Sequence, residues 1–404
     1  MLICTGVISE LHKVFRQATK HGRIFYLIFP LNWDPEAERF ITQNSFDTFW
    51  KIPFFALLTN GFLLTLYPPA KGFQLSVFEG TLFFNYLITI STLQSINVWF
   101  YHSHFRNLVN FFNKLIAFEK SNISQSNDDD FMAVGGKLMT TSIKPLATQL
   151  YSMKVNLGFV AAIYPTLPWN PLCAIVTKYW KVTPLFELNM VSICVRLGTM
   201  VIVWMTWSTF LNFVFLTMTV NFLSTLFCFK CALNLFGRNL LQANKSELEC
   251  HWKLLKKLKM FRQIQLLINE YNAIHKQSMM LVIVATVLFS AIMSAYTILN
   301  SGGSLSVPLL LVMVLILCMC FFVMVIGMMY PASVYSMSGH ILQNTKKYFQ
   351  PASTSFNLGC VRKYWLSFPV FKIQFFSGNF FEQATPLVFM DFCANMIVNL
   401  LMIH

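Results

Sequence analysis

The chain ends in FFEQATPLVFMDFCANMIVNLLMIH, residues 380–404, a stretch of about 20 apolar-dominated residues that is long enough to cross a bilayer core. Four of its side chains recur at spacings of four, four and three, so they lie on one stripe of a helix: Asp391, Asn395, Asn399 and Met402. A carboxylate and two amides cost free energy inside a membrane unless they face protein or water. The stretch therefore predicts a spanning helix that either lines a pore or forms hydrogen bonds with neighbouring helices.

The composition indicates that much of the remaining chain also lies in a membrane. Of 404 residues, 56% are hydrophobic and only 11% are charged, and the mean hydropathy is +0.57. A soluble domain usually contains about 25% charged residues, so this deficit indicates an all-α protein with several membrane spans. The net charge of +14 is compatible with nucleic-acid binding, but its distribution along the chain favours the cytoplasmic face of a membrane.

Seven long apolar segments predict seven transmembrane helices: residues 46–67, 75–101, 146–168, 197–229, 279–299, 306–330 and 380–403. Residues 1–45 precede them as a cytoplasmic segment, and residues 46–404 form the transmembrane domain. Amphipathic sequence continues the second span past residue 101, and apolar residues recur at helical spacing in residues 230–278. We therefore expect helices that extend from the spans into the cytoplasm, and a further one within residues 331–379.

The basic residues indicate which side of the membrane each loop faces. The N-terminal segment and alternate loops contain 26 of the 30 Lys and Arg residues, whereas the other side contains only Lys71, Lys178, Lys181 and Arg196. Because loops rich in Lys and Arg stay in the cytoplasm, the N-terminus is predicted inside and the C-terminus outside. Cys173 and Cys194 fall in the predicted outer loop and are candidates for a disulfide, although connectivity cannot be deduced from sequence.

No combination of residues in the sequence predicts a catalytic or metal site. Cys228-x-x-Cys231 lacks a second pair at zinc spacing, and His102-x-His104 lacks a third ligand. We interpret the cysteines as packing residues and the histidines as interface residues. The sequence also contains no P-loop and no nucleophile elbow, which argues against an enzyme and against a bound cofactor.

The number of spans, their orientation and the loop proportions resemble the insect odorant and gustatory receptor superfamily. The resemblance covers most of the chain and includes the long inner loop at residues 255–271, which ends in Leu-Ile-Asn-x-Tyr. It also includes Gly-x-Phe-Phe at residues 378–381, just before the last helix. The gustatory ending Thr-Tyr-(five apolar)-Gln-Phe matches residues 395–403 in length and position, but its Thr, Tyr, Gln and Phe are all replaced.

The resemblance implies a chemosensory receptor of the plasma membrane, of odorant or gustatory type, that acts as a ligand-gated non-selective cation channel. Four subunits would surround one pore, as a homotetramer or as a heterotetramer with a related co-receptor, and each would contribute its last helix. The implied partners are a small organic ligand and membrane lipid, with no nucleic acid.

Two other classes of membrane protein are alternatives. A seven-transmembrane receptor coupled to a G protein requires the reverse topology, and its Asp-Arg-Tyr and Asn-Pro-x-x-Tyr signatures are absent from the corresponding spans. A transporter would usually contain inverted repeats and broken helices with charges near the membrane midplane. The sequence contains no clear repeat, and most of its spans are uncharged.

The candidate pore residues lie in the second half of the last helix. Asp391 would concentrate cations by its charge, and Asn395 and Asn399 would hydrate a passing cation. Apolar side chains would form the constriction that excludes water when the channel is closed: Val398, Met402 and Ile403, of which the last two match the gate region of the family. The alternative for Asp391 is a paired or protonated carboxyl group between helices.

The resemblance also implies a ligand pocket in the outer half of the membrane, among the second, third, fourth and sixth spans. A cavity lined by aromatic residues and methionine suits a small apolar ligand. The candidate residues in these outer halves are Phe83, Tyr86, Phe159, Ile163, Tyr164, Met200, Trp204, Trp207, Met313 and Leu317. For each of them, ordinary helix packing or lipid contact is the alternative interpretation.

Overall fold

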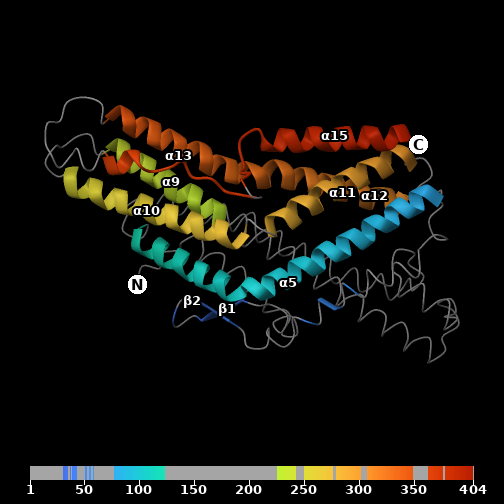
Figure 1. Ribbon diagram of the computed structural model, residues 1–404, viewed down its shortest axis with the longest axis horizontal. Coiled ribbons are helices and arrows are strands. Elements are labelled where there is room, and N and C mark those ends of the chain that lie inside the picture. Colours follow the sequence, from blue (N-terminus) through green and yellow to red (C-terminus); the bar gives the residue numbers. More distant parts are fainter. Residues whose placement is uncertain are drawn as a thin grey trace.

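In the computed structural model of the chain, long helices run along the longest axis of the molecule (Figure 1). The structure describes residues 31–34, 37, 39–42, 51, 54–55, 58, 77–122, 225–242, 250–275, 279–301, 307–348, 363–375 and 378–403. The predicted spans at residues 46–67, 146–168 and 197–229 lie wholly or mostly outside the described residues. The described helices are consistent with the predicted all-α class.

Helix α5 (Val77–Asn122) confirms that the second predicted span continues without a break beyond residue 101. At a rise of about 1.5 Å per residue, its 46 residues reach about 69 Å, more than twice the roughly 30 Å core of a bilayer. The distal part has one apolar face, because Phe105, Leu108, Phe112 and Leu115 recur at helical spacing and are all buried. This part therefore packs against protein, as a helix outside the membrane must.

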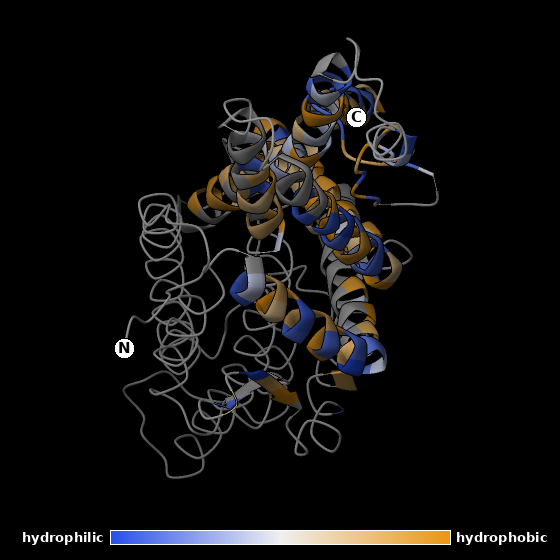
Figure 2. Ribbon diagram, turned by 90° about the vertical axis from the view of Figure 1, so that its left-hand side faces the viewer, coloured by the Kyte–Doolittle hydropathy of each residue, from blue (hydrophilic) through white to orange (hydrophobic). Residues whose placement is uncertain are grey.

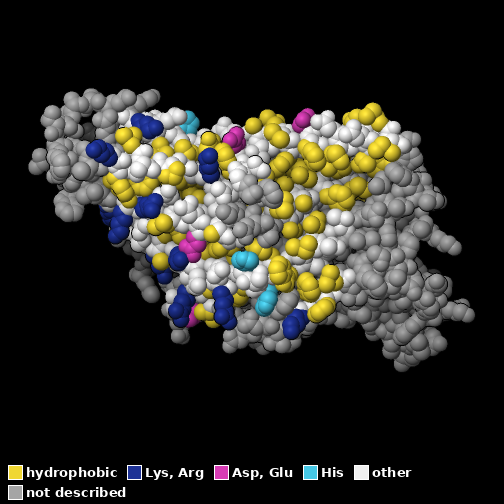
Figure 3. All heavy atoms as spheres, viewed as in Figure 1, with side chains coloured by type: hydrophobic (Ala, Val, Ile, Leu, Met, Phe, Trp, Pro, Cys, Tyr) yellow, Lys and Arg dark blue, Asp and Glu magenta, His cyan; other side chains and the backbone are white. Residues whose placement is uncertain are grey.

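Helices α9 (Thr225–Gln242), α10 (Cys250–His275) and the second half of α13 (Met328–Tyr348) pack together with the distal part of α5. We call this assembly the basic group, because Lys and Arg side chains gather over it, while hydrophobic side chains gather over the described helices farther along the molecule (Figure 3). Hydrophilic and hydrophobic residues alternate along these helices in Figure 2, as amphipathic packing requires. The predicted helices within residues 230–278 and 331–379 are therefore present.

Aromatic rings form the centre of the basic group. Phe236 of α9, Phe261 of α10 and Trp365 are fully buried, and their ring centroids lie 5.1–5.7 Å apart. The Phe371 ring stacks on Phe261 with a centroid separation of 4.5 Å. Burial of such large rings stabilises the group by several kcal/mol, at about 25 cal/mol per Å² of apolar surface. The chain that leads to the last helix is thereby anchored in this core.

The opposite end of the molecule contains α11 (Met279–Ser301), α12 (Val307–Phe322), the first half of α13 and α15 (Thr385–Ile403). Among the described residues, three segments are long and apolar enough to cross a membrane: Met280–Asn300, Met313–Lys346 and Thr385–Ile403. Helix α11 begins at the predicted residue 279 and ends two residues beyond the predicted residue 299. The length and apolarity of these segments indicate a membrane protein.

The sixth predicted span does not end at residue 330, because the helix continues through a π-helical turn, η3 (Val323–Gly327), into α13. Pro331 explains the irregular turn. Proline lacks an N–H group, and its ring clashes with the carbonyl group four residues earlier, which here belongs to Gly327 at the end of η3. The wider turn lets one continuous helix pass from the apolar end into the basic group.

A two-stranded antiparallel hairpin, β1 (Leu31–Asp34) and β2 (Arg39–Thr42), lies beside α5 within the segment predicted only as cytoplasmic. Asn113 of α5 binds the outer edge of β2. The Phe40 N–H donates to Asn113 Oδ1 at 2.8 Å, and Asn113 Nδ2 donates to the Phe40 carbonyl at 2.9 Å. One side-chain amide thus binds both backbone groups of Phe40 at the edge of the hairpin.

Helix α15 begins at Thr385, five residues after the predicted start at residue 380. Residues 380–384 belong instead to a turn: Gln374 and Phe380 form an antiparallel bridge, and the Phe381 N–H donates to the Ile373 carbonyl at 3.0 Å. The Thr385 hydroxyl accepts a hydrogen bond from the Glu382 N–H at 2.8 Å. The apolar Phe380 and Phe381 extended the prediction too far, because hydropathy does not distinguish a strand-like residue from a helical one.

Candidate functional site

Helix α15 carries the predicted pore residues, and it touches the rest of the subunit through one face. Cys393 is buried, and Phe389, Ile397 and Leu400 pack against the core at spacings of four, four and three. The packed face rests mainly on α11, with further contacts to α13 and η3 (Figure 1). The spacing places all four side chains on a single helical stripe.

The polar stripe of α15 lies on the side of the helix away from this packed stripe. Asp391, Asn395, Asn399 and Met402 each follow a member of the packed stripe by two residues, which is a rotation of about 200° on a helix. The first three are exposed, and Met402 is 73% exposed. The polar stripe therefore points away from the described helices against which α15 packs.

The candidate gate residues are also exposed in the single subunit. Val398 and Ile403 retain 53% and 74% of their surface. Asn395 Nδ2 donates to Asp391 Oδ2 at 3.3 Å, so Asp391 has a partner on its own helix. Among the described residues, this hydrogen bond of the polar stripe lies within α15 itself. Both interpretations of the stripe, a pore lining and hydrogen bonding to neighbouring helices, stay predictions.

The candidate ligand residues are only partly covered by the structure. On α12, Met313 is buried, and Leu317 is partly buried and packs against the core. Phe83 and Tyr86 belong to α5, but their side chains lie outside the described set. The remaining candidates lie outside the described residues, as do the two cysteines of the predicted disulfide: Phe159, Ile163, Tyr164, Met200, Trp204, Trp207, Cys173 and Cys194. The pocket therefore stays a prediction.

A stripe of hydroxyl groups on α11 was missed by the sequence analysis. Thr286, Ser290, Ser294 and Thr297 recur at spacings of four, four and three, which is the signal that could have found them. Ser294 is 1% exposed, and its hydroxyl has no hydrogen-bond partner among the described residues. Thr297 instead donates to the Met293 carbonyl at 2.7 Å. Helix α11 thus brings buried polar groups into the apolar end of the molecule.

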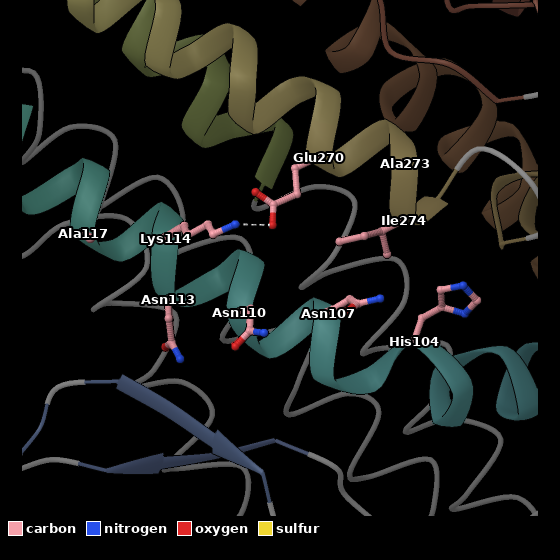
Figure 4. Close-up of a pocket in the computed structure, with 9 residues that line it drawn as sticks. All are labelled: His104, Asn107, Asn110, Asn113, Lys114, Ala117, Glu270, Ala273 and Ile274. Atoms are coloured by element: carbon pink, nitrogen blue, oxygen red, sulfur yellow. Dashed lines mark hydrogen bonds and ion pairs between the residues drawn. The ribbon is translucent and has the colours of Figure 1, made fainter.

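The structure also contains a polar cleft of about 720 Å³ between α5 and α10 in the basic group (Figure 4). Its walls are formed by His104, Asn107, Asn110, Asn113, Lys114, Ala117, Glu270, Ala273 and Ile274. Lys114 Nζ pairs with Glu270 Oε1 at 2.7 Å across the cleft. The Lys114 side chain is 60% exposed, so this pair contributes little to stability, about 0.5 kcal/mol.

The predicted packing and interface residues lie in this region. Cys228 and Cys231 of α9 are buried, in agreement with packing residues. His104 stacks on Phe100 with ring centroids 4.2 Å apart. Among the described residues, no group of three or more His, Cys, Asp or Glu side chains is placed to bind a metal ion.

Comparison with known proteins identifies the fold. No protein-family model and no curated protein matches the sequence. The solved structure of the insect olfactory receptor OR5 from Machilis hrabei matches with a TM-score of 0.64 and 10% identity, covering 97% of this chain and 100% of the receptor. The same receptor in complex with eugenol matches with a TM-score of 0.64 and 10% identity, covering 98% of this chain and all of the receptor. The chain therefore has the fold of an insect olfactory receptor.

Proposed function

We propose that this chain is a chemosensory receptor of the insect odorant and gustatory superfamily, and that it acts as a ligand-gated non-selective cation channel in the plasma membrane. The fold is the first support for this proposal, because the match spans nearly the whole chain. The single observation that carries the channel mechanism is the polar stripe on α15. Asp391, Asn395 and Asn399 face away from the subunit's own packing face in a helix apolar enough to span a membrane.

Polar groups on the outside of a spanning helix need a partner other than lipid. A carboxylate and two amides in contact with acyl chains would cost several kcal/mol. Association of four copies around an axis would remove these groups from lipid and bring them to a shared water-filled pore. Leu387, Val388 and Phe392, which are exposed in the single subunit, would then contact lipid or neighbouring subunits.

Within such a pore, the polar and apolar residues would have different roles. Asp391 would raise the local cation concentration, and Asn395 and Asn399 would replace part of a cation's hydration shell. Val398, Met402 and Ile403 lie near the end of the helix and would form an apolar ring that excludes water in the closed state. Opening would require this ring to widen.

The ligand would be a small organic odorant or tastant. The receptor of similar fold has been solved in complex with eugenol, a small molecule of this kind. In the present chain the ligand would bind in the outer half of the membrane, with Met313 and Leu317 of α12 among the contacts. It would favour the open arrangement through its higher affinity for that state. The subunits would assemble as a homotetramer or with a related co-receptor.

The experiment that tests the pore assignment replaces Asn399 with leucine in cells that express the full chain. We expect Asn399→Leu to change unit conductance or ion selectivity in currents evoked by a panel of odorants that includes eugenol, while surface expression stays the same. Met396→Leu, on the same helix but outside the polar stripe, is the control and should leave conductance unchanged. Identical currents in wild type and Asn399→Leu would remove this residue from the pore.

A further inference from the structure

The inference concerns the segment that connects the basic group to α15. Residues 368–373 lead away from Trp365, which is fully buried among aromatic rings, and belong to no helix or strand. Backbone groups outside regular secondary structure need other hydrogen-bond partners when they are buried. Two buried polar side chains from different helices provide them: Asn272 of α10, 7% exposed, and Ser338 of α13, fully buried.

Asn272 binds the segment at two points. Its Nδ2 donates to the Lys372 carbonyl at 2.7 Å, and its Oδ1 accepts from the Gln374 N–H at 3.0 Å. A side-chain amide is suited to this contact because it is donor and acceptor at once, whereas a carboxylate or an alkyl chain is not. These partners lie 100 and 102 residues away along the chain, so nothing local brings them together.

Ser338 binds the same segment from the other side. Its hydroxyl accepts a hydrogen bond from the Phe371 N–H at 3.0 Å and donates to the Tyr335 carbonyl at 2.9 Å. The hydroxyl is therefore fixed in one orientation by its own helix. Between them, Asn272 and Ser338 satisfy three backbone groups of residues 371–374, which ties the segment to α10 and α13 together.

The clamped segment passes directly into α15 through a short hairpin. The Phe375 N–H donates to the Asn379 carbonyl at 3.2 Å, and Gly378 makes the turn with a positive φ of 90°. The Phe375 ring then packs on Phe381, with centroids 4.7 Å apart, and on Phe389 of α15, at 5.8 Å. These ring contacts connect the clamped segment with the first turns of α15.

We propose that Asn272 and Ser338 are positioning residues for α15: by fixing residues 371–374 between α10 and α13, they set the position of the last helix relative to the basic group. Neither residue belongs to the polar stripe or to the candidate ligand pocket. The consequence for gating rests on the proposed function, because it requires α15 to line the pore. With the clamp broken, α15 is less firmly coupled to α10 and α13, so fewer channels open at saturating ligand.

The first test measures the clamp without reference to channel activity. Hydrogen exchange of the purified full chain reports the protection of the amide groups of Phe371 and Gln374. Because each loses its acceptor, Asn272→Ala should speed exchange at Gln374 about tenfold, and Ser338→Ala should do the same at Phe371. Asn269→Ala, at an exposed position one turn earlier on α10, is the matched control and should leave both rates unchanged.

The second test measures the consequence in cells that express the same variants. Asn272→Ala and Ser338→Ala should each lower the maximal current evoked by the odorant panel several-fold, while the half-maximal concentration of an active compound changes by less than about threefold. Exchange rates equal to wild type in both variants would overturn the clamp. Faster exchange with wild-type maximal current would overturn its role in gating. A wild-type chain that carries no current with any compound would count against the proposed function, while the exchange rates would still decide the clamp.

Discussion

At the scale of single residues, His275 shows how burial sets a protonation state. Its Nδ1 lies 2.8 Å from the Tyr271 carbonyl, which can only accept, so Nδ1 carries the hydrogen. Its Nε2 is buried and has no partner among the described residues. Burial lowers the pKa of His275 to about 4, the hydrogen bond to Tyr271 opposes this change, and the charge of nearby His104 adds to it. His275 is therefore neutral at pH 7.

The lowered pKa of His275 predicts that acid destabilises the basic group. In the unfolded chain this histidine binds a proton below about pH 6.5, whereas in the folded chain it does so only near pH 4. Stability is therefore lost as the pH falls through this window, by up to roughly 3 kcal/mol. The melting temperature in detergent should fall between pH 7.5 and pH 5.0, and His275→Gln should reduce the fall. An equal fall in both proteins would assign it to groups other than His275.

At the scale of an element, the hairpin before α15 depends on one backbone conformation. Gly378 has a φ of 90°, which side chains with a Cβ atom rarely adopt, although no atom lies within 4 Å of the place that a Cβ would occupy. Only the backbone, and not a steric clash, therefore disfavours a larger residue here.

This geometry predicts opposite effects of the same substitution at two glycines. Gly378→Ala should lower stability by about 1–2 kcal/mol because of its backbone conformation. Gly237→Ala, inside α9, should raise stability by about 0.5–1 kcal/mol, because alanine favours a helix and its Cβ would meet Ile341 at an ordinary 3.8 Å. Thermal unfolding in detergent shows whether each variant is less or more stable than wild type. If Gly378→Ala unfolds at the same temperature as wild type, the turn can adopt another backbone conformation without loss of stability.

Helix α15 also shows what exposure means for an element of a membrane protein. Its packed stripe is narrow, and most of its large apolar side chains are exposed, including Leu387 and Met402 at 68% and 73%. A helix this exposed contributes little to the stability of one subunit, because folding of the subunit buries little of the helix's apolar surface. Its sequence is consistent with contacts to lipid and to other subunits instead.

At the scale of the whole molecule, the separation of charged and apolar surfaces sets the orientation in the membrane. Lys and Arg gather over the basic group, and hydrophobic side chains gather over the described helices farther along the molecule (Figure 3). Because cytoplasmic segments are enriched in Lys and Arg, the basic group is predicted inside. The C-terminal end of α15 lies at the far end from the basic group (Figure 1) and is therefore predicted outside.

The orientation predicts the result of a topology experiment on intact cells. An epitope tag placed after His404 should stain without permeabilisation, because seven spans from an inside N-terminus place the C-terminus outside. A tag in the basic group, between α9 and α10, is the control and should stain only after permeabilisation. The reverse pattern would contradict the channel topology and favour a receptor coupled to a G protein.

The sequence by itself determined the all-α fold class and the positions of several of the described helices. Hydropathy and helical spacing are local properties, so they predicted α11, the extension of α5 and the helices of the basic group. They also predicted the polar stripe of α15, because its residues recur at spacings of four and three in the sequence. Its exposure had to come from the structure, since spacing does not reveal which face of a helix meets a neighbour.

Only the tertiary structure decided where α15 begins and what fixes the chain before it. Phe380 and Phe381 adjoin the apolar run of the last helix, yet the backbone of residues 379–381 pairs with residues 373–375 across a glycine turn. The amide of Asn272 and the hydroxyl of Ser338 bind partners 102 and 33 residues away. Such contacts depend on the packing of helices remote in sequence. A hydrogen bond requires two groups to be close in space, which no local pattern of residues specifies.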